Sequence, residues 1–144
     1  TRNEVVESTG IRIVNSLNSI DDNSLDLIYS NQVFEHIPEP HKIFTEMINK
    51  LRTGGIICIK VPNGARVTKQ IKKNKPWQIK QIHPLEHINC YNYRVFKQMA
   101  KGSDIKLIKE PYNPNGTTPI TYVKSNLKYL LQTTKNFHAY FKKY

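Results

Sequence analysis

The sequence has few of the features that mark several protein classes. Only two of its 144 residues, Cys58 and Cys90, are cysteines, too few for the disulfide framework of a small secreted protein. Unbroken apolar runs are a handful of residues long, as at 56–59, whereas a membrane-spanning helix needs about 20. The first ten residues are polar and carry no signal-peptide pattern. We therefore expect a cytoplasmic domain without a transmembrane segment.

Acidic side chains are scarce after residue 60. Residues 1–60 carry six basic and eight acidic side chains, whereas residues 61–144 carry sixteen basic and three acidic ones. Such a basic region can bind nucleic acid, a phosphorylated molecule or a membrane surface. Alternatively, Lys, Ile and Asn together supply 48 residues and have AT-rich codons, so genome composition could cause the excess without any partner. The densest basic run, 69–75, contains no aromatic residue for base stacking, which disfavours nucleic acid.

The apolar spacing predicts an α/β fold. Apolar runs at 11–14, 25–29, 56–61 and 105–108 predict strands. Helical spacing covers 2–9, 41–51, 67–71, 93–101 and 121–143. This alternation is typical of a parallel sheet with helices on both faces. For the basic, amphipathic helix at 121–143 we favour packing or a dimer surface and leave peripheral membrane contact open; the oligomeric state stays unknown.

Ligands of parallel sheets bind beyond the carboxyl ends of the strands. This rule places the candidate site in the segments that follow predicted strands, namely 15–20, 30–37, 62–66 and 109–116.

Two of these segments belong to a longer pattern. Residues 25–38 read LDLIYSNQVFEHIP, a helix follows, and residues 51–63 read LRTGGIICIKVPN. This order resembles the Rossmann-like, S-adenosylmethionine-dependent methyltransferases, and residues 83–89 (HPLEHIN) resemble members that act on small molecules, quinones or sugars. The resemblance covers about residues 5–110. It implies S-adenosylmethionine as cofactor and O- or N-methylation of a small-molecule acceptor.

One part of the family pattern is missing. The family's glycine-rich loop, an acidic residue followed by Gly-x-Gly-x-Gly, is not formed by any of the six glycines, and the first two strands are missing too. We therefore predict the carboxy-terminal portion of a protein of about 200–250 residues, active only in that longer form. It would hold a partial methyltransferase domain over 1–112, then a turn and the basic helix over 113–144. The alternatives are a non-catalytic remnant and an RNA-binding or RNA-modifying domain.

The resemblance implies a set of cofactor contacts. Ser16 and Leu17 would contact the adenine, with the hydroxyl toward the amine and the leucine against the ring. Ser30, Asn31 and Gln32 would contact the methionine part. The alternative is that these polar residues only form turns and caps.

Glu35 and His36 are the candidate catalytic pair. A histidine with a pKa near 6.5 can take a proton from a hydroxyl nucleophile, so His36 is a candidate general base. Glu35 would orient the substrate or contact a metal. The alternative is a structural histidine that bonds to backbone, because methyl transfer needs mainly positioning.

Asn63, His83 and His87 are candidate substrate contacts, the two histidines in a loop over the acceptor. His83, His87 and Cys90 are also spaced H-x3-H-x2-C, and histidines four residues apart on a helix can bind zinc. Pro84 and the lack of a fourth ligand argue against such a site. We therefore predict no metal site from this motif.

Overall fold

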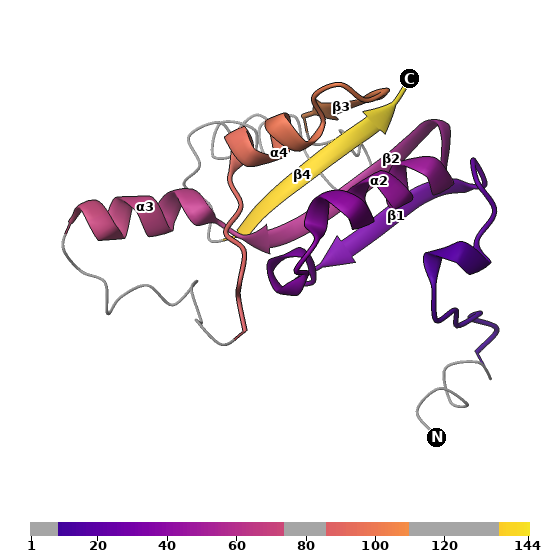
Figure 1. The fold of residues 1–144 in the computed structure, drawn as a ribbon, viewed down its shortest axis with the longest axis horizontal. Coiled ribbons are helices and arrows are strands. Elements are labelled where there is room, and N and C mark those ends of the chain that lie inside the picture. The colour runs from indigo at the N-terminus through magenta and orange to yellow at the C-terminus, as the bar shows by residue number, and fades with distance from the viewer. Residues whose placement is uncertain (1–8, 74–85, 110–135) are drawn as a thin grey trace, which may run out of the picture.

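The computed structural model describes residues 9–73, 86–109 and 136–144 (Figure 1). Its elements are two 3-10 helices, three α-helices and four strands: η1 (Leu17–Ser19), β1 (Leu25–Asn31), η2 (Phe34–His36), α2 (Pro40–Lys50), β2 (Leu51–Pro62), α3 (Gly64–Lys72), α4 (Tyr93–Met99), β3 (Ile105–Ile108) and β4 (Asn136–Lys143). Most of the helix predicted at 2–9 and the first part of the helix predicted at 121–143 lie outside the described residues.

The four strands form one mixed sheet in the order β1-β2-β4-β3 (Figure 1). β1 runs parallel to β2, whereas β4 runs antiparallel to both β2 and β3. Our prediction of a wholly parallel sheet is therefore wrong. The helix predicted through residue 143 is also wrong for 136–143, which form β4. Phe137, Ala139 and Phe141 are buried while the residues between them are only half-buried, a period of two that fits a strand.

The segment from β1 to β2 forms as predicted. Pro40 begins α2, where its fixed φ suits a helix and its missing N–H costs nothing. Phe44, Met47 and Ile48 are the buried residues of this helix. Gly54 then adopts a φ of +84°, a left-handed conformation that favours glycine, just before β2 begins regular pairing with β1 at Ile56. The segment is a strand–helix–strand unit with parallel strands.

The strand predicted at 11–14 does not form. These residues have no regular secondary structure, and Ile11 and Val14 are exposed. A strand needs a neighbour to pair its backbone groups, and none of the described strands pairs with this segment. β1 is accordingly an edge strand of the described sheet. The other predicted strands and the helices at 67–71 and 93–101 are confirmed, with shifted ends.

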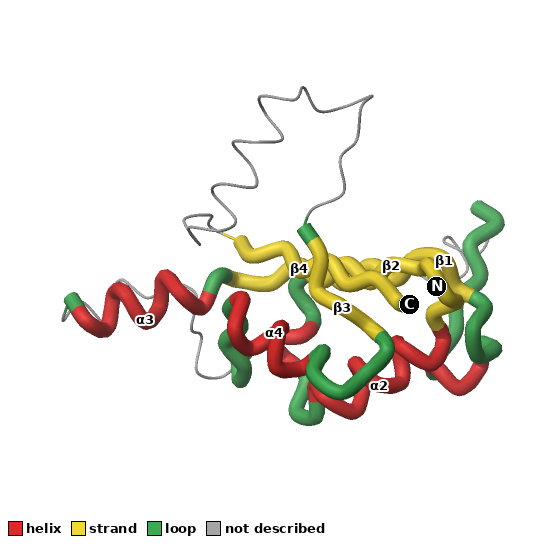
Figure 2. Tube along the Cα trace, turned by 90° about the horizontal axis from the view of Figure 1, so that it is seen from above, coloured by secondary structure: helices red, strands yellow, loops and turns green. Residues whose placement is uncertain are grey.

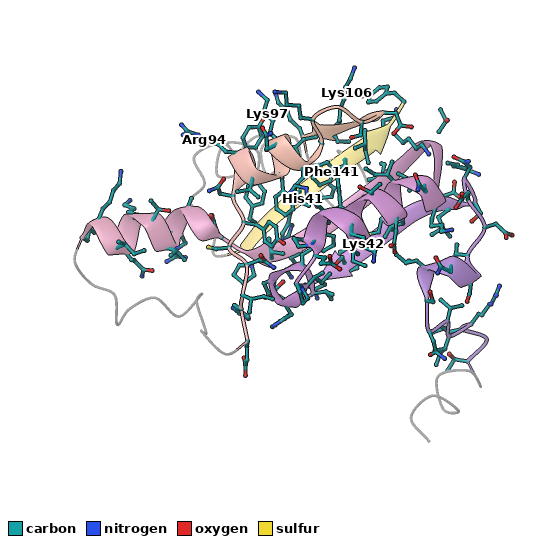
Figure 3. All side chains as sticks on the ribbon, viewed as in Figure 1. His41, Lys42, Arg94, Lys97, Lys106 and Phe141 are labelled. Atoms are coloured by element: carbon teal, nitrogen blue, oxygen red, sulfur yellow. The ribbon has the colours of Figure 1, made fainter. Side chains whose placement is uncertain are left out.

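Aromatic rings join the two helices α2 and α4 to the sheet. Both helices lie on the same face of the sheet (Figure 2). Phe44 of α2 and Phe96 of α4 contact Phe141 of β4, with ring centroids 4.9 Å and 5.7 Å apart (Figure 3). Phe96 also stacks on Phe137 and on Tyr91, at 5.6 Å and 5.0 Å. Each buried ring removes a large apolar area from water, so this cluster fixes β4 and α4 against α2. It confirms Phe96 as a core residue, and Tyr93 packs partly buried against the same core.

A buried cation holds the end of β4. The Lys143 ammonium donates hydrogen bonds to the carbonyl oxygens of Ile48 (3.0 Å) and Leu51 (2.9 Å) and to Oδ1 of Asn23 (2.9 Å). The Asp104 carboxylate lies 3.8 Å from it. The two carbonyls lie at the end of α2, where such groups lack partners within the helix. Lys143 therefore connects β4 to the junction of α2 and β2.

None of the described helices is both long and apolar enough to cross a bilayer.

Candidate functional site

A cavity of about 520 Å³ lies among η1, the end of β1, η2 and α2. We call it the β1 cavity. Ser16 and Leu17 line it from η1, and Ile28 and Ser30 line it from β1. It therefore lies where a parallel α/β sheet binds its ligands, beside the carboxyl end of a strand.

The structure brings together three of the five predicted cofactor contacts, because Ser16, Leu17 and Ser30 all line the β1 cavity. Asn31 and Gln32 are exposed and do not line it. The Gln32 backbone has a φ of +54°, the left-handed region that non-glycine residues rarely adopt. Ser16 also has a structural role, since its hydroxyl accepts a hydrogen bond (3.1 Å) that caps η1. The contacts of all five residues with a cofactor stay predictions.

Glu35, His36 and His87 form a second group of functional side chains, which we call the Glu-His cluster. One nitrogen or oxygen atom of each residue lies within 4.8 Å of the corresponding atoms of the other two. The two imidazole rings meet edge to face, with centroids 4.8 Å apart. Glu35 is only 1% exposed, and neither of its carboxylate oxygens has a hydrogen-bond partner among the described residues. The cluster thus combines a buried, unpaired carboxylate with two imidazoles.

The tautomer of His36 follows from a hydrogen bond. Its Nδ1 lies 2.6 Å from the carbonyl oxygen of Glu86. A carbonyl oxygen only accepts, so Nδ1 must carry the hydrogen and donate it. In the neutral ring the lone pair is then on Nε2. His36 is exposed, so this nitrogen can accept a proton or bind a cation.

The segment 86–91 is tied to η2 by Asn89 and Tyr91. The Asn89 side-chain amide donates to the carbonyl of Ile37 at 2.5 Å, and its backbone N–H donates to the carbonyl of Glu35 at 3.0 Å. The Tyr91 hydroxyl donates to the carbonyl of Phe34 at 3.1 Å. Burial, and secondly the charge of Glu35, raise the pKa of Tyr91, which keeps this hydroxyl a donor. These contacts place His87 against His36.

Sequence reasoning overlooked Asn89 and Tyr91 as positioning residues. Asn89 closes the HPLEHIN segment, which was the one available signal for it. Tyr91 had no signal, because its partner Phe34 lies 57 residues away and accepts through its backbone.

Asn63 is fully buried at the start of α3. Its Oδ1 accepts a hydrogen bond from the backbone N–H of Ala65 at 3.0 Å and so caps this helix. The next residue, Gly64, donates its N–H to the carbonyl of Tyr91 at 2.7 Å, and a Cβ at this position would lie 2.6 Å from that oxygen. The segments 62–64 and 90–91 therefore approach each other closely. A substrate contact of Asn63 stays a prediction.

The remaining predicted residues lie apart from these groups. His83 is outside the described residues. Cys90 is not part of the Glu-His cluster, and burial raises the pKa of its thiol. Cys58 is buried in β2, as predicted.

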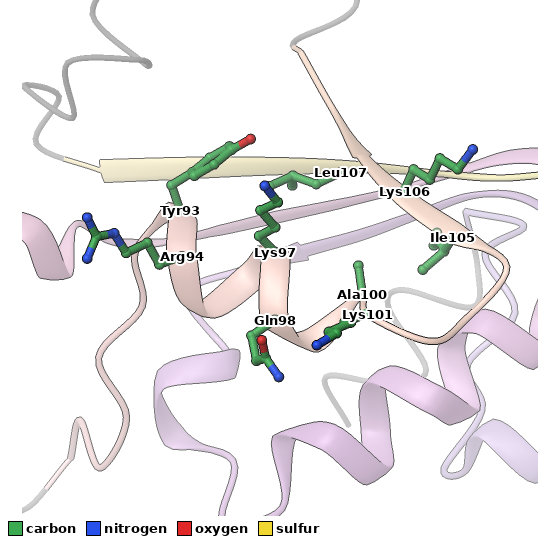
Figure 4. Close-up of a pocket in the computed structure, with 9 residues that line it drawn as sticks. All are labelled: Tyr93, Arg94, Lys97, Gln98, Ala100, Lys101, Ile105, Lys106 and Leu107. Atoms are coloured by element: carbon green, nitrogen blue, oxygen red, sulfur yellow. The ribbon is translucent and has the colours of Figure 1, made fainter.

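A second cavity, of about 580 Å³, lies between α4 and β3 (Figure 4). Four basic residues are among those that line it: Arg94, Lys97, Lys101 and Lys106 (Figures 3 and 4). It is slightly larger than the β1 cavity, but none of the predicted site residues lines it. The β1 cavity is therefore the better candidate for the cofactor.

The comparison with protein families agrees with the fold and the position of the site. Residues 6–110 match the model of a family described as a methyltransferase domain. This match covers more than half of the sequence, so the chain belongs to this family of S-adenosylmethionine-dependent methyltransferases. The predicted family, its Rossmann-like α/β fold and S-adenosylmethionine as the cofactor of the family are thereby confirmed.

Individual relatives are distant. A trans-aconitate 2-methyltransferase from Rhizobium rhizogenes is 29% identical over 118 residues, which are 72% of this chain and 45% of that protein. A methyltransferase from Archaeoglobus fulgidus has 17% identity and a TM-score of 0.56, with 94% of this chain and 69% of that one covered. A type 11 methyltransferase from Sulfolobus solfataricus has 17% identity and a TM-score of 0.57, with 98% and 63% covered. The chain thus spans less than half of the curated relative that it matches.

Proposed function

We propose that this sequence belongs to an enzyme that transfers the methyl group of S-adenosylmethionine to a small-molecule acceptor, by O- or N-methylation. The observation that carries the proposal is the convergence of Ser16, Leu17 and Ser30 on one cavity beside the end of β1. These are residues that the family pattern assigns to the cofactor, and they come from segments separated in sequence.

The walls of the β1 cavity fit part of such a cofactor. Leu17 and Ile28 offer apolar surface for a purine ring, and the hydroxyls of Ser16 and Ser30 offer hydrogen bonds to polar groups. The volume of about 520 Å³ lies within the range of small-molecule sites, roughly 300–1,000 Å³. We propose that these four residues bind the cofactor and that the glycine-rich part of the site lies in a preceding region of the full-length protein.

When bound, S-adenosylmethionine supplies an electrophilic methyl group on a sulfonium. The residues of this chain would then position the acceptor and receive its proton. His36 is suited to the second task, because its exposed ring holds Nδ1–H on the Glu86 carbonyl and keeps the lone pair on Nε2. Asn89 and Tyr91 hold the backbone of η2, and rigid placement of the reacting groups is the main requirement of a displacement at a methyl carbon.

The class of acceptor is supported only by a relative. The Rhizobium relative is named for trans-aconitate, a small carboxylate, and this favours a small molecule over a nucleic acid. The basic cavity between α4 and β3 keeps an anionic acceptor or partner among the outcomes of an acceptor screen.

Isothermal titration of the full-length gene product with S-adenosylmethionine tests the proposal. Leu17→Ser alters the β1 cavity, and Leu107→Ser makes the same change in the second cavity. Both leucines are half-buried and pack against the core, so the two variants are matched for loss of stability. We expect the Kd to rise about tenfold for Leu17→Ser, or about 1.4 kcal/mol, and to stay unchanged for Leu107→Ser.

Two results would contradict this expectation in different ways. Equal affinities of the two variants would remove the cofactor from the β1 cavity. A full-length protein that binds no S-adenosylmethionine would favour the non-catalytic remnant.

A further inference from the structure

We propose that Glu35, His36 and His87 bind a divalent transition-metal ion of the zinc class. This inference goes beyond methyl transfer, because nothing in the proposed function requires a metal. The set has two imidazoles and one carboxylate, the same donor types that hold zinc in catalytic sites with open coordination positions.

The first argument is the state of Glu35. This side chain is 1% exposed, and both carboxylate oxygens lack a hydrogen-bond partner among the described residues. An ionised carboxylate in such surroundings costs several kcal/mol unless a positive charge accompanies it. A bound cation at the cluster would supply that charge and use the lone pairs of both oxygens.

The second argument is the hydrogen bond of His36. Histidines that bind metals generally donate their other ring N–H to a carboxylate, a backbone carbonyl or a water. His36 makes such a bond through Nδ1 to the carbonyl of Glu86, at 2.6 Å. The ring is thereby fixed with Nε2 as its metal-binding atom. This observation is independent of the burial of Glu35.

The third argument is distance. Two ligand atoms that each lie about 2.1 Å from a cation are at most about 4.2 Å apart. The three candidate atoms lie within 4.8 Å of one another. A closure of less than about 1 Å would therefore suffice, which small side-chain rotations can provide. Asn89 and Tyr91 already fix the backbone on both sides of the cluster.

Three ligands from the described residues leave coordination positions for water or for an oxygen of a small molecule. We therefore expect an ion that exchanges ligands, in contrast to the closed four-ligand centre of a structural zinc site.

Titration of the 144-residue chain with Co²⁺, and by calorimetry with Zn²⁺, tests the proposal without any cofactor. The protein is first treated with a chelator, which is then removed. We expect one equivalent of either ion to bind, with visible absorption of the cobalt complex. Glu35→Gln and His87→Ala should each weaken binding at least about tenfold. His41→Ala is the matched control, because His41 is an exposed histidine of α2 outside the cluster (Figure 3).

The outcomes are separable. Absence of binding by the wild-type chain overturns the proposal, and so does binding that neither variant weakens, since the ion then lies elsewhere. Circular dichroism checks that each variant is folded. If Glu35→Gln does not fold, the half-buried His87 still provides the test. Because no S-adenosylmethionine is present, failure here leaves the proposed methyl transfer untouched, and failure of cofactor binding leaves the metal site untouched.

Discussion

Two regions of this molecule are held together by contacts of different range. In the amino-terminal region, residues 25–62, β1 pairs with β2 through partners such as Ile28 and Ile57, which are 29 residues apart. In the carboxy-terminal region, residues 86–109 and 136–144, β4 pairs with β2 through partners such as Ile57 and Phe141, which are 84 residues apart. The first region is a local strand–helix–strand unit, whereas the second is defined by what it meets far away in the sequence.

The difference explains where the site can form. The β1 cavity is built entirely from residues 15–47, so the local unit with η1 is sufficient for it. The Glu-His cluster needs His87, which the long-range contacts of Asn89 and Tyr91 bring to η2. Loss of packing in the carboxy-terminal region should therefore disturb the cluster before the cavity.

The largest effect is expected from Phe141→Ala in β4. This ring is fully buried between Phe44 and Phe96, so its removal leaves a cavity in the core that both regions share. We expect a loss of about 4 kcal/mol in the free energy of unfolding, measured with urea. Leu27→Ala in β1 is the control and should cost less than about 1 kcal/mol, because Leu27 is 60% exposed. Similar losses in the two variants would mean that β4 is not central to the core.

A smaller loss is expected for Lys143→Met, which keeps the chain length but removes the ammonium. The carbonyls of Ile48 and Leu51 and the amide oxygen of Asn23 would lose their donor, at a cost of about 3 kcal/mol. Lys142→Met changes the neighbouring lysine, whose ammonium lies over the Tyr144 ring, and should cost less than about 1 kcal/mol. Equal urea midpoints for the two variants would show that Lys143 does not join the regions.

The smallest effect concerns the cysteines, one in each region. Burial raises the pKa of the Cys90 thiol, so less of the reactive thiolate is present at a given pH. Alkylation of Cys90 should be slower than that of an unfolded cysteine at pH 8 and should still accelerate above pH 9. Cys58, buried in β2, should react only on unfolding. Peptide mapping by mass spectrometry separates the two sites. A rate for Cys90 equal to that of the unfolded chain would mean that segment 86–91 is not packed as described.

Local patterns predicted the amino-terminal region well. The apolar residues of 25–29 and 56–61 and the spacing of Phe44, Met47 and Ile48 mark elements that pack on their neighbours in sequence. For β4 the same reasoning failed. Phe137 and Phe141 are four residues apart, which fits a helix, but Ala139 lies between them on the same buried side. The period of two was present, but only pairing with β2 and β3 selects it over the helical interpretation.

The candidate site divides in the same way. Ser16, Leu17 and Ser30 follow from the rule that ligands bind beyond strand ends, and Glu35 and His36 stand side by side in a recognisable turn. The approach of His87 to His36 could not be read from the sequence, because the bonds that produce it are made largely to backbone carbonyls of η2 and depend on no residue pattern.

The sequence by itself determined the family, the strand–helix–strand unit and the side chains available for chemistry, since these depend on residue type and on contacts close in the chain. Only the tertiary structure decided that β4 enters the sheet antiparallel between β2 and β3, and that an unpaired Glu35 faces two histidines. The physical reason is that burial and partnership of a group are set by every segment that packs around it, whereas periodicity reports only on its neighbours in sequence.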